Sequence, residues 1–234
     1  AEARKGQDHI YRGKPVKIAV VSNRTPQAAQ DVSHYLKDYL PHNVRLVRKL
    51  NQADYIVRLH QKHFNTNLHI KDKSYKWAHT SHKPKKHYGI YGKRIGWTEV
   101  NAVALADFDF GVVLEDHYGK ILDRDHIRGR ARQYVCWGEN LKVPTPRGYR
   151  STNYFPNDYV RKLFAQAPGT GNGPRVQILH EVAKKIAHQI ARQTVPHAQY
   201  ASYHGYKKGY TKGHKYGYSK PKYDHGYQRY SYNR

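Results

Sequence analysis

The C-terminal 35 residues, 200–234, limit most strongly what this chain can fold into. They contain ten tyrosines, five glycines, eight Lys or Arg residues and one acid, but no Leu, Ile, Val, Met or Phe. A segment without aliphatic side chains cannot bury enough apolar surface to offset the entropy lost on ordering. Four of its glycines recur at every fourth residue, and an aromatic ring follows each of them. The pattern predicts an extended low-complexity tail that contacts a surface other than the chain's own core.

The other residues, roughly 195 of them, suit one domain with a hydrophobic core. We predict an extended basic arm at residues 1–15, an α/β domain at residues 16–195 and the tail at residues 196–234. Within the domain, residues 60–96 carry nine Lys or Arg and one acid. This basic segment, rich in Lys, His and Tyr, predicts a long basic hairpin or loop inserted into the domain.

The formal net charge of +25, from 42 Lys or Arg against 17 Asp or Glu, favours anionic partners. Nucleic acid, anionic lipid or lipopolysaccharide head groups, acidic polysaccharide and an acidic protein all fit such a field. The single cysteine, Cys136, excludes an intramolecular disulfide framework and a cysteine-rich zinc site, and we expect it to be a small buried residue on a strand.

The start of the chain, Ala1-Glu2-Ala3, has no Met, and no Met occurs elsewhere. We expect that a signal peptide has been removed at a small-residue site, and simple loss of an initiator Met is the alternative. No run of 18 apolar residues is present, so no transmembrane helix is predicted. The expected location is the periplasm, the outer membrane or the cell exterior.

The order of apolar patterns predicts an α/β (α+β) fold with a mixed or antiparallel sheet against two principal helices. A nearly continuous apolar run at residues 16–22 predicts a strand covered on both faces. Thr25 and Pro26 then begin a helix that Pro41 ends. A Gly-containing turn at residues 117–120 predicts an antiparallel meander. Further strands are predicted at residues 43–50, 55–60, 68–75, 97–108, 110–115, 121–125 and 130–137.

Two helices are predicted near the end of the domain. A short one covers residues 158–167, and a glycine-rich linker follows it. The second begins at Pro174 and closes at Pro196. Its apolar stripe faces the core, with basic side chains opposite; the stripe consists of Val176, Leu179, Val182, Ala183, Ile186 and Ile190.

This order of elements resembles the α/β domain shared by bacterial envelope assembly proteins. The resemblance rests on residues 17–25 (KIAVVSNRT), 53–57 (ADYIV), 107–122 and 185–191 (KIAHQIA), and it covers roughly residues 16–193 without the basic segment. The family includes the curli secretion lipoprotein, the outer-membrane activators of penicillin-binding proteins, the N-terminal domain of the Tol-system propeller protein and accessory proteins of flagellar outer rings. The resemblance implies assembly or scaffolding and no catalysis.

Three patterns could carry chemistry. His60, His63, His79 and His82 have spacings that metal ligands use, but nine cations surround them, so a solvated basic hairpin is the preferred interpretation. The glycines at 169–173 could cradle a phosphate at a helix N-terminus, but a flexible linker is favoured because no P-loop ending follows. No cofactor is expected.

Six carboxylates between residues 107 and 125 could supply an acid/base pair. They lie beside predicted turns and amid four arginines, which favours local ion pairs and turn caps instead. No serine, cysteine and histidine pattern typical of nucleophilic catalysis is present, so we expect a protein that is not an enzyme.

The tail has three interpretations: rings that dock into grooves of neighbouring protein subunits, rings that stack on nucleic-acid bases, or a disordered segment. Docking is preferred, and the predicted partners are protein subunits of a homo- or hetero-oligomer, with an anionic polymer or lipid head groups possible. The expected contact residues are Tyr206, Tyr210, Tyr216, Tyr218, Tyr223, Tyr227, Lys207, Lys208 and Lys212 in the tail and Lys83, Lys85 and Lys86 in the basic segment.

The sequence therefore predicts a non-enzymatic structural or assembly protein of the bacterial envelope or surface. A ring or filament is the expected assembly, because the tail of one subunit can then lie on the next. A basic nucleic-acid-binding protein is the first alternative. A metal- or haem-associated protein that uses its histidines is the second.

Overall fold

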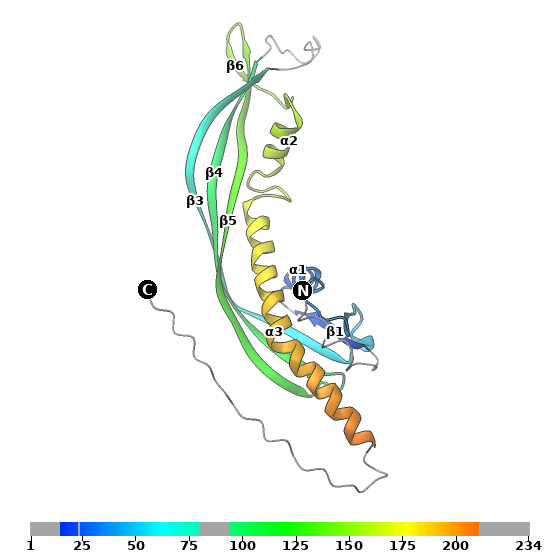
Figure 1. Cartoon of the computed structure of the whole chain (residues 1–234). Coiled ribbons are helices and arrows are strands. Elements are labelled where there is room, and N and C mark those ends of the chain that lie inside the picture. Colours follow the sequence, from blue (N-terminus) through cyan, green and yellow to red (C-terminus); the bar gives the residue numbers. More distant parts are fainter. Residues whose placement is uncertain (1–14, 23, 80–93, 211–234) are drawn as a thin grey trace, which may run out of the picture.

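The computed structural model describes residues 15–22, 24–79 and 94–210, with side chains as far as Ala201. Six strands form one mixed sheet in the order β2-β1-β3-β4-β5-β6, and three α-helices pack on it. Three of the strands form a long curved ribbon, along which helix α3 runs (Figure 1). This architecture confirms the α+β class that the sequence predicts.

The first part of the chain forms the parallel portion of the sheet. Strand β1 (Val16–Val21) pairs in parallel with β2 (Val44–Leu46) and with the start of β3 (Tyr55–His79). Adjacent residues Ile18 and Ala19 point to opposite faces and both are buried, which explains the continuous apolar run. Helix α1 (Pro26–Leu36) joins β1 to β2 and ends earlier than predicted, because residues 37–40 form turns. A short 3-10 helix, η1 (Leu50–Gln52), precedes β3.

The ribbon consists of β3, β4 (Arg94–Asp116) and β5 (Ile121–Thr145), all antiparallel. Strand β6 (Gly148–Ser151) pairs with the end of β5. The prediction of separate strands at residues 97–108 and 110–115 is wrong, as is the division of β5, because each pair forms one strand. The polar residues between the apolar runs are positions on the outer face of the sheet: Asp109 lies between Phe108 and Phe110, which are buried on the inner face.

The basic segment belongs to this ribbon in its described part. Residues 60–79 continue β3, and residues 94–96 start β4. Residues 60–79 pair in antiparallel register with β4, from His79 with Arg94 back to His60 with Gly111. The segment is therefore an extension of the main sheet rather than a separately folded unit.

The turn between β4 and β5 is confirmed. The Asp116 carboxylate accepts hydrogen bonds from the backbone N–H groups of Tyr118 at 3.0 Å and Lys120 at 2.9 Å. Gly119 has a φ of 82°, a conformation that glycine adopts without strain. The hairpin position predicted from the glycine is correct because the aspartate and the glycine each satisfy a local requirement of the turn.

Helix α3 (Pro174–Tyr210) is longer than predicted and contains Pro196 in its interior. Proline removes one helical hydrogen bond, so the sequence predicts an end at this position. The helix continues because Val195 and Ala198 on either side of the proline are buried in the main core, and this burial offsets the lost hydrogen bond. The first part of the predicted tail is therefore helical. No helix in the described part is both long and apolar enough to cross a membrane.

Helices α2 (Asp158–Ala165) and α3 cover opposite faces of the twisted ribbon. Val135 and Trp137 belong to the main core under α3, whereas Cys136 packs in the smaller core under α2. A Cβ added to Gly138 would lie 2.4 Å from the Phe164 ring of α2. Because alternate residues of a strand face opposite sides, α2 and α3 pack on different faces of the same strands.

Two buried tryptophans of the ribbon differ in their hydrogen bonding. The same substitution at both positions therefore measures the contribution of one hydrogen bond. The Trp137 indole N–H donates to Glu139 Oε1 at 2.9 Å. The Trp97 indole N–H is buried and has no acceptor among the described residues. We expect Trp137→Phe to lower the free energy of unfolding by about 1–2 kcal/mol more than Trp97→Phe, because only the first change removes a hydrogen bond to a carboxylate. Urea denaturation at pH 7 measures the difference, and equal losses would contradict the assignment.

The same pair predicts a pH dependence. The hydrogen bond from Trp137, helped by Lys73, lowers the pKa of Glu139, although burial opposes part of the shift. A carboxyl whose folded pKa is depressed contributes stability above its unfolded pKa, and this contribution is lost as the pH falls through the folded pKa. The extra cost of Trp137→Phe should therefore shrink as the pH falls from 7 to about 3.

Candidate partner-binding surface

The end of the ribbon formed by His79, Arg94 and β6, here the distal end, has one face that α3 does not cover. Helix α3 begins well short of this end, and α2 packs on the other face (Figure 1). Beyond the start of α3, alternate residues of the strands still point to the face that α3 covers elsewhere. Their side chains are exposed here because no described helix packs on them. An uncovered sheet face with large apolar residues is typical of an interaction surface.

Three aromatic side chains occupy this face and contact one another. Tyr75 is 49% exposed, Trp77 40% and Tyr149 63%. The rings of Tyr75 and Trp77 lie edge to face with their centroids 4.9 Å apart, and those of Trp77 and Tyr149 are 5.7 Å apart. Desolvation, followed by the proximity of Tyr149, raises the pKa of Tyr75, so its hydroxyl stays neutral. The mutual packing fixes the rings before any partner binds.

Gly96 allows this arrangement. It pairs with Trp77 across the sheet, and a Cβ at this position would lie 2.7 Å from the Tyr75 hydroxyl oxygen and 2.8 Å from the Trp77 ring. Any other residue would push the rings away from the sheet. We call Tyr75, Trp77, Tyr149 and Gly96 together the aromatic surface.

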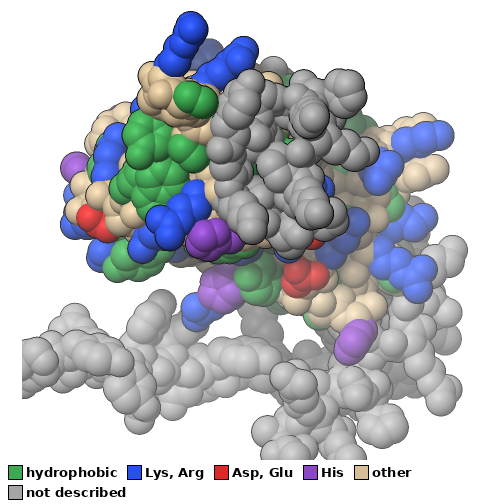
Figure 2. All heavy atoms as spheres, turned by 90° about the horizontal axis from the view of Figure 1, so that it is seen from above, with side chains coloured by type: hydrophobic (Ala, Val, Ile, Leu, Met, Phe, Trp, Pro, Cys, Tyr) green, Lys and Arg blue, Asp and Glu red, His purple; other side chains and the backbone are tan. Residues whose placement is uncertain are grey.

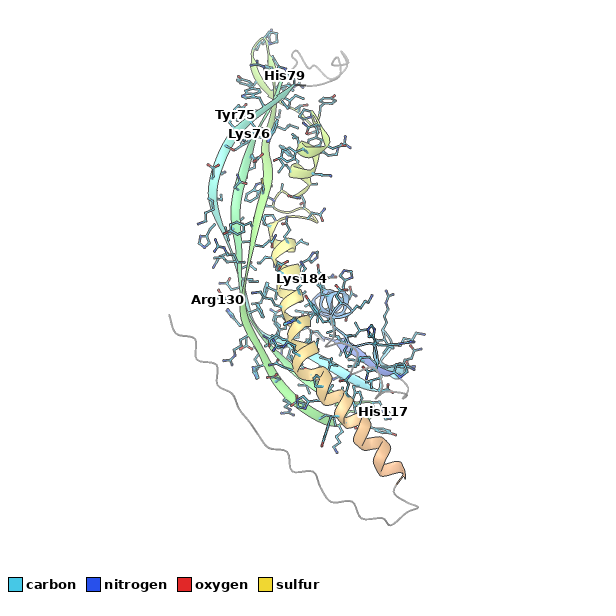
Figure 3. All side chains as sticks on the ribbon, in the orientation of Figure 1. Tyr75, Lys76, His79, His117, Arg130 and Lys184 are labelled. Carbon is cyan, nitrogen blue, oxygen red and sulfur yellow. The ribbon has the colours of Figure 1, made fainter. Side chains whose placement is uncertain are left out.

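Positive charge lies on the same face as the aromatic surface. Lys142 pairs with Gly96 on β5, and Arg94 lies two residues before Gly96 on β4, so both stand on the same face. The neighbouring acid, Glu139, is bound by Lys73 at 3.2 Å. In the view onto the distal end, hydrophobic side chains gather beside Lys and Arg side chains (Figure 2). Tyr75 and His79 lie near this end, and His117 lies near the opposite one (Figure 3).

Substitution of Gly96 tests how much the aromatic surface depends on this arrangement. We expect Gly96→Val to displace the Tyr75 and Trp77 rings and to weaken partner binding by about 10-fold or more. The free energy of unfolding should fall by no more than about 1–3 kcal/mol, because the ring ends can move into solvent. Denaturation and a sedimentation assay of the assembled state measure the two effects. Unchanged assembly would exclude the pre-packed rings as a requirement.

The structure places only part of the predicted contact residues. Tyr206, Tyr210, Lys207 and Lys208 lie in the helical backbone of α3. The remaining predicted contact residues, and His82, lie outside the described residues: Lys83, Lys85, Lys86, Lys212, Tyr216, Tyr218, Tyr223 and Tyr227.

The three described histidines among the candidate metal ligands do not come together at one place. His60 and His63 lie where β3 leaves the parallel portion of the sheet, and His79 lies at the end of that strand. The 16 residues from His63 to His79 correspond to roughly 50 Å along a strand. Within the described residues, no group of three or more His, Cys, Asp or Glu could hold a metal ion.

The carboxylates of β4 and the β4–β5 hairpin form local ion pairs and turn caps, as predicted. Arg58 binds Glu115 at 2.7 Å, and Arg128 binds Asp109 at 2.8 Å. Asp116 caps the turn. These pairs lie across neighbouring strands and stabilise the register of the ribbon.

Cys136 is half-buried in the smaller core, close to the buried strand position that the sequence predicts. Burial, followed by the proximity of Glu99, raises the pKa of its thiol. A thiol with a raised pKa is mostly protonated and poorly reactive at neutral pH. Its position therefore fits a packing role.

None of the sequence patterns considered above predicts the aromatic surface. Tyr75 and Trp77 stand two residues apart on one strand, a spacing that places both rings on the same face. This signal was present in the sequence, but the proximity to Gly96 and Tyr149 depends on the register of four strands.

Comparisons with known proteins give weak similarities. No protein-family model matches the chain, and no curated protein matches it. Among solved structures, a minor lipoprotein from Acinetobacter baumannii is similar, with 14% identity, coverage of 77% of this chain and 96% of that chain, and a TM-score of 0.32. A homolog of a neuraminyllactose-binding hemagglutinin from Helicobacter pylori has 9% identity, coverage of 81% and 92%, and a TM-score of 0.29. Similarity at this level assigns neither a family nor a function to the chain.

Proposed function

We propose that this chain is a non-enzymatic structural or assembly protein of the bacterial envelope or surface, and that it binds a protein partner through the aromatic surface. The observation that carries the proposal is the exposure of three packed aromatic rings on a sheet face that no described helix covers. Aromatic residues dominate the binding energy of protein interfaces because each ring buries a large area at a small entropic cost.

The position of the aromatic surface supports an assembly role. It lies on regular strands at one end of an elongated ribbon, far from the turn that holds His117 (Figure 3). Rings on strands are held in place before binding, and this lowers the entropic cost of association. The cations around the rings favour a partner whose facing surface is acidic.

A ring or filament of repeated subunits remains the proposed assembly. An elongated subunit with a contact surface at one end can join a neighbour in a head-to-tail manner. The predicted tyrosines and lysines of the tail, Tyr206, Tyr210 and Tyr218 among them, would then add contacts to an adjacent subunit. Export of the chain to the envelope is part of the same proposal.

Nucleic-acid binding is the second candidate. A sheet face that carries aromatic rings together with Arg94 and Lys142 has the features that single-strand binding proteins use for stacking and phosphate contacts. The net charge of +25 adds to this possibility. The two candidates differ in their dependence on salt.

Salt distinguishes them. We expect only weak binding of a fluorescein-labelled single-stranded oligonucleotide in anisotropy titrations near 50 mM salt, with no change on Trp77→Ala. The assembled protein should survive raised salt, because buried ring area rather than charge would hold it together. Sub-micromolar binding that falls by roughly 0.7 log units per phosphate contact per log unit of salt, and that Trp77→Ala abolishes, would instead support nucleic-acid binding.

A further inference from the structure

A groove of about 710 Å³ lies beside α1 at the carboxyl ends of the parallel strands β1 and β2. Its volume falls in the range of small-molecule sites, and the carboxyl ends of parallel strands are a common location for such sites. The groove is far along the chain from the aromatic surface and shares no lining residue with it. A ligand of this groove would therefore bind apart from the partner of the aromatic surface.

One face of α1 forms a wall of the groove along the whole helix. Pro26, Ala29, Ser33 and Lys37 recur at intervals of three or four residues and all line it. At 1.5 Å per residue, this stripe is about 16 Å long. The shape therefore suits an elongated ligand better than a compact one.

Half of the lining residues are apolar and half are polar, and the charged ones are cationic. Val20, Val21, Leu46 and Val47 line the groove from the ends of the two strands. Lys37 and Arg48 also line it, and no Asp or Glu does. The side-chain nitrogens of Lys37 and Arg48 have no hydrogen bond or ion pair with a described residue. An apolar strand wall beside unpaired cations matches a ligand with a hydrocarbon body and an anionic head group.

A second cavity differs from the α1 groove in the pairing of its cations. It has a volume of about 530 Å³ and lies between α3 and β5, near Arg130 and Lys184 (Figure 3). Three of its four cations are paired with carboxylates: Lys184 binds Glu181 at 2.6 Å, Arg130 binds Asp107 at 2.8 Å, and Arg128 binds Asp109 at 2.8 Å. The fourth, Lys185, donates to the Arg130 carbonyl at 2.6 Å. An anion would have to compete with these carboxylates there, whereas the α1 groove offers cations that no carboxylate occupies.

We infer that the α1 groove binds a single-chain anionic amphiphile, with its hydrocarbon chain along α1 and its phosphate or carboxylate head at Lys37 or Arg48. The serine hydroxyls of the groove are not the recognition groups. Ser33 Oγ already donates to the Ala29 carbonyl at 2.7 Å, and Ser22 Oγ is bound to the Thr25 hydroxyl at 2.9 Å. Charge at the head and apolar contact along the chain would determine affinity.

Calorimetric titration of the full chain tests the inference, with dodecyl phosphate below its micelle-forming concentration as the probe. We expect saturable 1:1 binding that Lys37→Gln with Arg48→Gln weakens by about 10-fold or more. Gln30→Trp, which places a ring into the groove from an exposed position, should also weaken binding. Both variants should keep the unfolding midpoint of the unchanged protein.

Controls separate the groove from general attraction to a basic protein. Lys17→Gln with Arg45→Gln removes the same charge from exposed positions on β1 and β2 outside the groove, and it should change Kd by less than about 2-fold. An equal loss in this control would overturn the inference. Equally tight binding of uncharged dodecyl maltoside would refute the role of the head group, and equally tight binding of inorganic phosphate would refute the role of the chain.

Discussion

Ile186→Asp is expected to abolish folding of the domain. Ile186 lies on α3 in the middle of the main core and is 1% exposed. An aspartate there would bury a carboxylate without a partner, at a cost above about 4–5 kcal/mol. Small domains are stable by about 5–15 kcal/mol, so most of this stability would be lost. Far-UV circular dichroism and urea denaturation measure the loss.

Gln189→Asp is the matched control for this prediction. Gln189 is exposed on the same helix, less than one turn away, and the substitution introduces the same charge. Its effect on the free energy of unfolding should stay within about 0.5 kcal/mol. If the two substitutions change the free energy of unfolding equally, the Ile186 face of α3 does not pack in the core, and the described fold is wrong.

Combined Trp77→Ala and Tyr149→Ala is expected to break the assembly and leave the monomer folded. Both rings are exposed and lie outside the buried cores, so the free energy of unfolding should fall by less than about 1–2 kcal/mol. Their loss should weaken partner binding by about 30-fold or more, since one aromatic hot spot already contributes about 2 kcal/mol and neighbouring hot spots do not add fully. Sedimentation velocity of the protein in extracts of its own cells measures the assembled fraction.

Tyr134→Ala provides the control. Tyr134 is 68% exposed on β5, outside the aromatic surface, and Arg132 covers its ring at 4.9 Å. The substitution removes a similar exposed area and should leave the assembly intact. Dissociation in this variant would show that general surface hydrophobicity, and not the aromatic surface, holds the subunits together.

Local chemistry made much of the fold predictable. The continuous apolar run before Ser22, the Pro26 helix start and the Asp116 turn each appear where the sequence predicts them. The α3 stripe is correct for Val182, Ala183, Ile186 and Ile190, but Val176 and Leu179 are only partly buried, and Ile178 is the buried residue near the start of the helix. These features depend on residues close in sequence, so periodicity and turn chemistry are sufficient to locate them.

The length of the elements was not predictable in the same way. Polar residues of β4 and β5 look like strand ends in the sequence, but their partners on the neighbouring strand form ion pairs, as Arg128 does with Asp109. Helix α3 passes through Pro196 because tertiary contacts bury Val195 and Ala198. Both features depend on contacts between residues far apart in the chain, which a local pattern does not contain.

The candidate surface was missed for a related reason. The composition predicts contact residues in the tail and among the lysines of the basic segment. The rings of Tyr75, Trp77 and Tyr149 come together only through the register of four strands, with Gly96 beneath them. Strand register, and not composition, therefore creates the aromatic surface.

Site-specific photo-crosslinking in living cells tests the proposed partner binding most directly. A benzophenone amino acid at position 149 lies on the aromatic surface, and one at position 118 lies at the opposite end of the ribbon, where Tyr118 is 84% exposed. The account predicts crosslinks from position 149 to one defined protein species, identified by mass spectrometry as this chain or another protein, and none above background from position 118. Equal yields at the two positions, or crosslinks from position 149 only to nucleic acid, would contradict it.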